Sequence, residues 1–258
     1  MLRFKSLGSG SSGNATVVEA RSGSQVTRLL IDCGFGLKHL DARLGWAGLT
    51  ASQIDAIFIT HEHGDHIGCA RQLALRERIP VWMSQGTHAA IGLCDFGEKL
   101  NTARDSQAID LGGLLVMPFT VPHDAREPLQ LTCSDGASRL GVLTDVGHST
   151  AHALAHLGNC QALLLECNHD PDLLAASGYP AFLKKRVGGS HGHLANADAA
   201  AIALAVQHAG LNQVVAAHLS EQNNRPELVR TTLAAALGRE APEIGIAHAI
   251  DGTPWINV

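Results

Sequence analysis

The sequence feature that most constrains this chain is the segment THEHGDH, residues 60 to 66. It follows the apolar run IDAIFI and precedes IGCARQLALRER, whose apolar residues have helical spacing. A strand, a tight turn and a helix are therefore expected, with three histidines and an aspartate at the junction. A solvated histidine-rich loop would explain one His-X-His pair, but four potential ligands within one turn can serve two metal ions. The segment predicts a metal site at the end of a strand.

Length and composition limit the class of protein. The 258 residues, 45% of them hydrophobic, can bury the core of one large domain, expected to span residues 1–258. The six cysteines form no C-x-x-C pair, and the start MLRFKSLGSG lacks the apolar core of a signal peptide, which favours the cytoplasm. No apolar run approaches the roughly 20 residues that span a bilayer, so membrane insertion is not expected. The net charge of -5 argues against coating nucleic acid through bulk charge, but permits an enzyme that grips a few phosphates.

Short apolar runs alternate with helical stretches, which predicts an α/β fold of sheet layers flanked by helices. Strands are expected at NATVVEA, TRLLIDCG, IDAIFIT, PVWM, RLGVLTD, QALLLEC and NQVVAAH. Helices are expected over residues 66–78, 86–93, 150–157 and 196–209. The opening GSGSSGN is interpreted as a glycine-rich connection between strands, with a phosphate-contacting loop as the alternative.

Five polar residues follow apolar runs at the carboxyl ends of expected strands: Asp32, His61, Asp145, Glu166 and His218. Open sheets with helical connections gather their functional sites at this edge, so the five side chains are expected to face one crevice. Asp32 taken alone could equally be a helix cap or a turn residue. Asp145 and His218 are stronger candidates, because the cluster at residues 61–66 needs further ligands to complete two coordination shells.

The sequence resembles a known superfamily. HEHGDH matches the His-X-His-X-Asp-His signature of the metallo-beta-lactamase fold, and the matching motifs extend over nearly the whole chain. GSGSSGNATVVEA, LLIDCGF, VPHDAREP, GVLTDVGH, LLLECNHD, GHLANADAA and AAHLSEQNNRPEL look like the bacterial exonuclease group called WalJ or YycJ, a relative of tRNase Z, RNase J and the PhnP phosphodiesterase. The resemblance implies an αββα sandwich of two mixed sheets flanked by helices.

The resemblance also implies two divalent metal ions, zinc or manganese, and seven ligands. One ion would be held by His61, His63 and His123, and the other by Asp65, His66 and His218. Asp145 would bridge them, and Asp32 would accept a hydrogen bond from a ligand imidazole. Two such ions can share a hydroxide, lower its pKa and hold a phosphoryl oxygen during in-line attack.

The same resemblance assigns catalytic roles to Asp65, His193 and Glu166. His193 matches a histidine that stands beside the metals without ligating them, and Glu166 matches its acidic partner. A carboxylate bonded to His193 would keep the imidazole charged, able to stabilise phosphoryl oxygens or to protonate the leaving oxygen. His191 is a rival for this role, and His148 is a less favoured candidate ligand because the first ion already has His123.

The substrate is less constrained by the sequence. The basic run LKKRVGG, residues 183–189, could bring Lys184, Lys185 and Arg186 to a polyanion, or could be a solvated helix end. Asn223 and Arg225 follow His218 and could orient a substrate or cap the next helix.

Three functions are compatible with these observations. The favoured one is a binuclear metal-dependent phosphodiesterase, a DNA 5′ to 3′ exonuclease with nucleic acid as its partner. The second is a small-molecule hydrolase of the same fold, acting on a cyclic phosphodiester, a thioester or a lactone. The third, a non-catalytic zinc-stabilised module, is disfavoured because structural zinc sites close their coordination shells.

Overall fold

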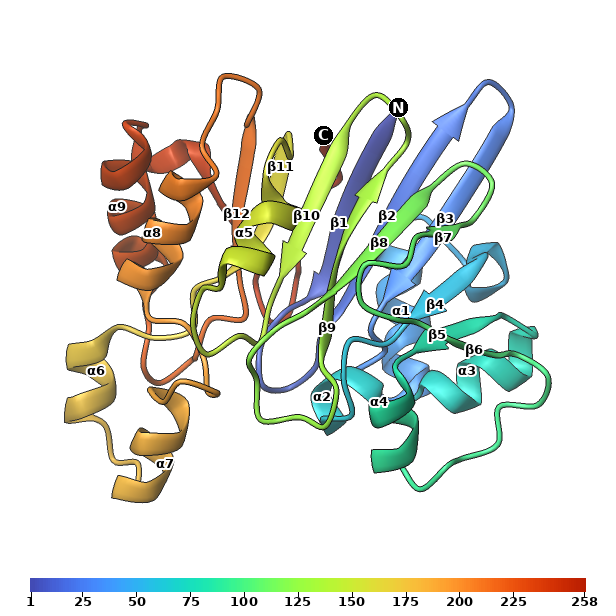
Figure 1. The fold of residues 1–258 in the computed structure, drawn as a ribbon, viewed down its shortest axis with the longest axis horizontal. Helices are drawn as coiled ribbons and strands as arrows, with labels where there is room; N and C mark the ends of the chain where they lie inside the picture. Colours follow the sequence, from blue (N-terminus) through green and yellow to red (C-terminus); the bar gives the residue numbers. More distant parts are fainter.

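Two mixed seven-stranded sheets face each other in the computed structural model, which describes residues 1–258 (Figure 1). The first sheet has the order β14-β1-β2-β3-β4-β5-β6, with β1 (Leu2–Gly8), β2 (Ala15–Ser22), β3 (Gln25–Ile31), β4 (Ala56–Phe58), β5 (Val81–Met83), β6 (Leu100–Thr102) and β14 (Ile256–Asn257). The second has the order β13-β12-β11-β10-β9-β8-β7, with β7 (Ile109–Asp110), β8 (Leu115–Thr120), β9 (Leu129–Ser134), β10 (Arg139–Leu143), β11 (Ala162–Glu166), β12 (Gln213–Ala217) and β13 (Ile244–Ile246).

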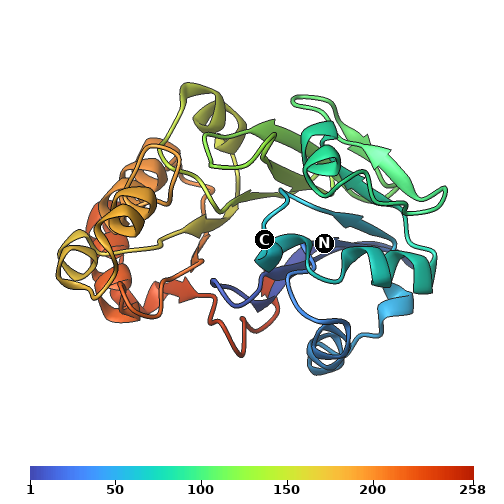
Figure 2. The same ribbon diagram turned by 90° about the horizontal axis from the view of Figure 1, so that it is seen from below.

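Helices cover the outer faces of both sheets (Figure 2). The first half of the chain contributes α1 (Leu37–Trp46), α2 (Gly64–Ile67), α3 (Ala70–Glu77) and α4 (Gln85–Ala90). The second half contributes α5 (Ala151–Leu157), α6 (Pro171–Ala176), α7 (Ala181–Val187), α8 (Asn196–Ala205) and α9 (Pro226–Leu237). Two short 3-10 turns, η1 (Ala51–Gln53) and η2 (Ala241–Glu243), complete the set. None of the helices combines the length and apolar character needed to cross a bilayer.

Three clusters of buried apolar side chains hold these layers together. One lies between the sheets and includes Phe4 and Leu164. The second packs α1 and α3 onto the first sheet through residues such as Leu40 and Leu73, and the third packs α5, α8 and α9 onto the second sheet. Helix, sheet, sheet and helix therefore follow one another, and the expected αββα sandwich is confirmed.

The predicted elements differ from the structure mainly at their ends. Each expected strand is present, but the helix expected over residues 66–78 is two helices, α2 and α3. Gly68 separates them with φ of 29°, and a Cβ there would lie 2.3 Å from the carbonyl oxygen of Cys33, so the chain turns where only glycine fits. The helix expected over 196–209 ends at Ala205, and the Asn196 side chain at its start bonds the Asn224 side chain.

The order of the strands determines where the site lies. β3 and β4 are parallel, as are β10, β11 and β12, so within each set the carboxyl ends share one edge. Figure 1 shows α2, α4, α6 and α7 along the edge where β10 ends. The residues that directly follow these strands are therefore close neighbours in space.

Candidate metal centre

The THEHGDH segment lies where β4 ends and α2 begins. His61 and His66 are fully buried, whereas His63 and Asp65 are 27% and 25% exposed. Helix α2 is a single turn that begins after His63, which brings the four side chains to one end of the sheet. A Cβ on Gly34 would lie 1.7 Å from the carbonyl oxygen of Asp65, so this close approach of two backbones requires glycine.

Three histidines direct ring nitrogens at one another. Nδ1 of His63 lies 3.0 Å from Nε2 of His61 and 3.3 Å from Nε2 of His123. The opposite nitrogens are held, since Oγ1 of Thr60 lies 3.0 Å from Nδ1 of His61, and Nδ1 of His123 donates to the Gly192 carbonyl at 3.0 Å. The backbone bond makes Nδ1 the protonated nitrogen of His123, so Nε2 presents its lone pair to the group.

A second group joins Asp65, His66 and His218. Oδ2 of Asp65 lies 3.7 Å from Nε2 of His66 and 3.6 Å from Nε2 of His218. Nδ1 of His66 donates to Oδ2 of Asp32 at 2.8 Å, which is the contact expected for Asp32. Both imidazoles are thus oriented by a carboxylate on one side and face the same point with Nε2.

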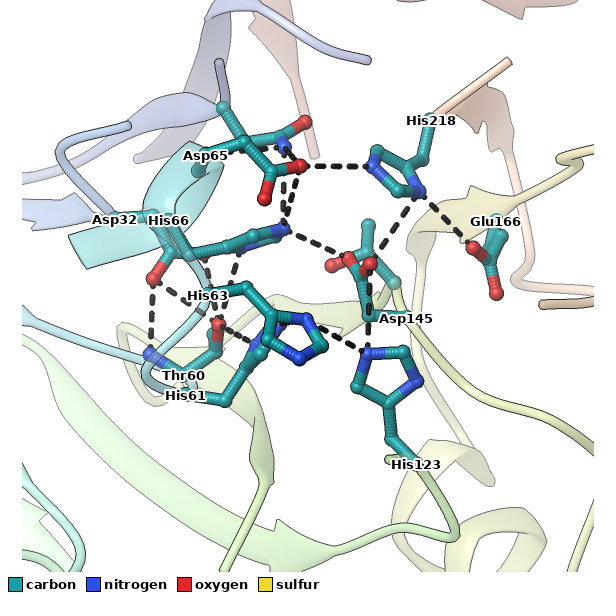
Figure 3. Close-up of polar contacts among 12 residues, drawn as sticks. Asp32, Thr60, His61, His63, Asp65, His66, His123, Asp145, Glu166 and His218 are labelled. Atoms are coloured by element: carbon teal, nitrogen blue, oxygen red, sulfur yellow. Dashed lines mark hydrogen bonds and ion pairs between the residues drawn. The ribbon is translucent and has the colours of Figure 1, made fainter. Parts of the chain in front are cut away.

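Asp145 lies between the two groups (Figure 3). Its carboxylate is 2% exposed, with Oδ2 3.1 Å from Nε2 of His66 and Oδ1 3.9 Å from Nε2 of His123. Oδ1 also lies 3.4 Å from Nδ1 of His218. One carboxylate therefore faces both histidine groups at once.

Three of these residues have a left-handed backbone. Asp32, Asp145 and His218 have φ of 60°, 53° and 55°, and each follows a strand end. For a residue with a Cβ, this backbone conformation is unfavourable by about 1–3 kcal/mol at strained sites. The turn takes each side chain out of the strand alternation and aims it into the centre.

Glu166 and His193 form a pair beside Asp145. Nδ1 of His193 lies 2.7 Å from Oε1 of Glu166, and the same oxygen lies 3.1 Å from Nδ1 of His218. The other carboxylate oxygen, Oε2, accepts the backbone N–H groups of Val146 and Leu194. His193 is 22% exposed, and with Nδ1 held by Glu166 its Nε2 can meet another partner.

The carboxylates and imidazoles of the centre shift one another's pKa values. Burial alone would lower the pKa of His218, but the negative charge of Asp145 and the neighbouring carboxylates of Asp65 and Glu166 raise it to about 10. Burial would raise the pKa of Glu166, yet the charge and hydrogen bond of His193 and the bond from His218 lower it to about 2. A divalent cation would compete with the protons on these imidazoles, which makes metal affinity dependent on pH.

Sequence reasoning did not identify three polar residues that support the centre. Oγ1 of Thr60 lies 2.9 Å from Oδ2 of Asp32 and also contacts His61. The only feature of the sequence that could have indicated this role is its position directly before the histidine cluster. Asn14 donates to the carbonyl oxygen of Asp65, and Ser9 accepts the backbone N–H of His218 at 2.8 Å. Both belong to GSGSSGN, which therefore acts as a structural connection beneath the site.

The rival histidines lie outside the centre. His148 is exposed and bonds the carbonyl oxygen of Ser190 at 2.8 Å, and it belongs to none of the metal-ligand groups. His191 is exposed and lies beside the Ser190 hydroxyl and the ring of His148.

The residues predicted to bind substrate are scattered. Lys184 bonds the Ala175 carbonyl, Arg186 pairs with Asp124 at 2.6 Å, and Lys185 is exposed. The prediction that Asn223 meets substrate is not supported, because the residue is 1% exposed and its polar side-chain atoms lie inside the protein. Arg225 bonds loop carbonyl oxygens from Glu221 to Asn224.

The donor set fits divalent cations. Four groups of three or four ligand atoms, each within 4.8 Å of one another, occur in the centre, and Asp145 belongs to two of them. Nε2 of His218 and Oδ2 of Asp145 are buried and make no hydrogen bond, although unpartnered buried polar atoms are costly. Cations between the groups would satisfy both atoms.

Comparison with known proteins gives a consistent result. A model described as the beta-lactamase superfamily domain matches residues 27–219. Exodeoxyribonuclease YycJ of Bacillus anthracis is 31% identical over 98% of this chain and 95% of its own length. Exodeoxyribonuclease WalJ of Streptococcus pneumoniae is 27% identical over 97% of this chain and 94% of its own length. The crystal structure of the metallo-beta-lactamase fold protein YhfI from Bacillus subtilis superimposes with a TM-score of 0.76 at 16% identity, covering 100% of both chains.

Proposed function

The chain is a hydrolase of the beta-lactamase superfamily, and from this premise we propose that it is a two-metal phosphodiesterase that degrades DNA from the 5′ end. The observation that carries the proposal is the pair of three-residue ligand groups with the Asp145 carboxylate facing both of them. One ion would be bound by His61, His63 and His123, the other by Asp65, His66 and His218, with Asp145 between them. One domain spanning residues 1–258 is part of the proposal, supported by the apolar cluster that joins the two sheets.

Bound in these groups, zinc or manganese ions would polarise a phosphoryl oxygen and make a water molecule more acidic. The protein's own contribution is orientation. Asp32, Thr60 and the Gly192 carbonyl fix the rings of the ligand histidines, and Asp65 has an exposed carboxylate edge that can accept a hydrogen bond from the attacking water.

His193 is proposed to be the acid of the reaction. Water forms a new P–O bond, and the bond from phosphorus to the leaving 3′ oxygen breaks with its electron pair on that oxygen. Nε2 of His193 donates the proton that this oxygen needs, while Glu166 holds Nδ1 and stabilises the charged ring. The result is one water consumed, one hydroxyl on the released nucleotide and one 5′ phosphate on the remaining strand.

DNA is proposed as the substrate because two relatives that match nearly the whole chain are named exodeoxyribonucleases. One observation favours a smaller phosphodiester as the second candidate. Arg186 is already paired with Asp124, which leaves Lys185 as the exposed, unpaired cation of the basic run.

The test incubates the metal-loaded protein with 5′-labelled single-stranded DNA, double-stranded DNA, RNA and bis(p-nitrophenyl) phosphate. The proposal expects mononucleotides to accumulate from the 5′ end of DNA, faster than from RNA. Cleavage of bis(p-nitrophenyl) phosphate alone would favour the small-molecule hydrolase. Metal-loaded protein that cleaves no phosphodiester would refute both.

A further inference from the structure

A cavity of about 560 Å³ opens beside His193, between α6, the end of α7 and the start of α8. Pro171, Leu174 and Ala195 give it apolar walls, and His169, Lys184 and Asp198 add polar groups. Figure 1 shows α6 and α7 along the same edge of the molecule as α2, the helix that carries Asp65 and His66. Cavities of roughly 300–1,000 Å³ are the size that holds small ligands, so one nucleotide would fit here.

Gly188 keeps this cavity open, although the fold does not require glycine there. Its φ of -86° and ψ of 10° are available to any residue. A Cβ would meet Leu174 at 3.4 Å, the Lys184 carbonyl oxygen at 3.5 Å and His169 at 3.9 Å, which are ordinary van der Waals contacts. A side chain at residue 188 would therefore be tolerated by the backbone and would enter the cavity.

The neighbouring glycines behave differently. A Cβ on Gly147 would lie 2.1 Å from the Ser190 carbonyl oxygen, and one on Gly192 would lie 2.1 Å from that of Arg186. Close backbone packing therefore requires glycine at both of these positions. At residue 188 no such contact requires glycine, and the absence of a side chain there only leaves space in the cavity.

His169 supplies the second sign of a ligand. The residue is 4% exposed and lines the cavity, and its Nε2 lies 3.9 Å from the position of a Cβ on Gly188, with no hydrogen bond to the protein. Burial lowers the pKa of His169, so its ring is neutral and offers one donor and one acceptor. A ligand with amide or hydroxyl groups in the cavity would give this nitrogen a hydrogen-bond partner.

We propose that this cavity binds the nucleotide that the reaction releases, a deoxynucleoside 5′-monophosphate. This rests on the proposed function, because an acid must come within about 2.6–3.2 Å of the leaving oxygen, so the released nucleotide must lie against His193. Its base packs on Pro171, Leu174 and Ala195, His169 bonds a polar edge, and Lys184 faces the 5′ phosphate. A cavity that holds one nucleotide would account for the proposed release of single nucleotides from an end.

The test compares Gly188→Leu with the control Gly178→Leu, both in metal-loaded protein. Gly178 lies between α6 and α7, and a Cβ there would meet nothing within 4 Å. Calorimetry measures binding of thymidine 5′-monophosphate and of inorganic phosphate, and kinetics measure cleavage of a DNA oligonucleotide and of bis(p-nitrophenyl) phosphate. His169→Phe, which keeps an aromatic ring but removes its hydrogen-bonding nitrogens, is measured in the same way.

Gly188→Leu is expected to weaken thymidine 5′-monophosphate binding and to lower kcat/KM on DNA by about 10-fold or more each. Phosphate binding and bis(p-nitrophenyl) phosphate cleavage should stay within about twofold, because a nitrophenyl group is smaller than a nucleotide and needs no such cavity. Unchanged nucleotide binding, or equal loss on both substrates, would overturn the inference. If the wild-type protein cleaved no diester, the proposed function would fail, while nucleotide binding by the two glycine variants would still decide the cavity.

Discussion

Replacing His193 with alanine separates proton donation from metal binding. The change removes a ring whose Nδ1 is bonded to Glu166 at 2.7 Å, but it removes no member of the two three-residue groups proposed to hold the ions. A positioned acid contributes about 100-fold or more, and 100-fold corresponds to about 2.7 kcal/mol of transition-state stabilisation. We therefore expect His193→Ala to retain its metals and to lose about 100-fold in kcat on DNA.

The leaving group gives the sharper measurement. The 3′ oxygen of a nucleotide departs as a strongly basic alkoxide and needs a proton, whereas p-nitrophenolate departs readily without one. On bis(p-nitrophenyl) phosphate the variant should therefore stay within about fivefold of the wild type, if His193 acts as an acid. Elemental analysis of each preparation, run beside the kinetics, shows whether metal content is unchanged.

His191→Ala is the matched control, because His191 is exposed and contacts Ser190 and His148 outside the centre. It should cleave both substrates like the wild type. An equal loss on both substrates in His193→Ala would mean that the ring stabilises phosphoryl charge instead of donating a proton. Loss of a metal would make His193 a ligand, and normal turnover of DNA would refute its role altogether.

Three further predictions concern the metals and the fold. Asp145→Ala should reduce occupancy of both ions, because its carboxylate faces both groups, and full occupancy by elemental analysis would exclude a bridging role. A chelator should abolish phosphodiesterase activity, and added zinc or manganese should restore it; activity that survives complete metal removal would contradict the mechanism. Glu19→Leu should lower the free energy of unfolding by about 3 kcal/mol in urea titrations without changing kcat, because Glu19 is fully buried among Arg3, Arg21 and Arg28. Burial would raise the pKa of Glu19, but these arginines lower it, so its contribution is present above about pH 4.3 and is lost as the pH falls below that value.

The sequence predicted those parts of the fold that depend on local pattern. Alternating apolar runs identified β10, β11 and β12, and polar residues directly after them marked the edge where the site lies. The break between α2 and α3 was missed, because it depends on the approach of Gly68 to the Cys33 carbonyl, which is 35 positions away in the chain. Contacts between residues far apart in the chain produce no periodic pattern in the sequence.

The candidate site was predictable as a set of residue types but not as a network. Histidine and aspartate are recognisable ligands at any position, whereas Thr60, Asn14 and Ser9 are common turn residues. Their roles come from what the fold brings near them: Asp32, Asp65 and the backbone of His218. Asn223 shows the opposite error, since a polar residue beside a ligand proved to be buried.

Glu166 contacts both the proposed acid, His193, and the proposed metal ligand His218. Oε1 meets Nδ1 of both His193 and His218, while Oε2 accepts two backbone N–H groups. A glutamine at this position would have to use its one oxygen for the backbone donors, so its NH2 group would face the two imidazoles. Each Nδ1 would then have to accept, which moves the proton of a neutral His218 to Nε2, the atom directed at Asp65. Glu166→Gln should therefore weaken metal binding by His218 as well as the acid, unlike His193→Ala, and equal metal content in the two variants would show that the shared carboxylate does not set the His218 tautomer.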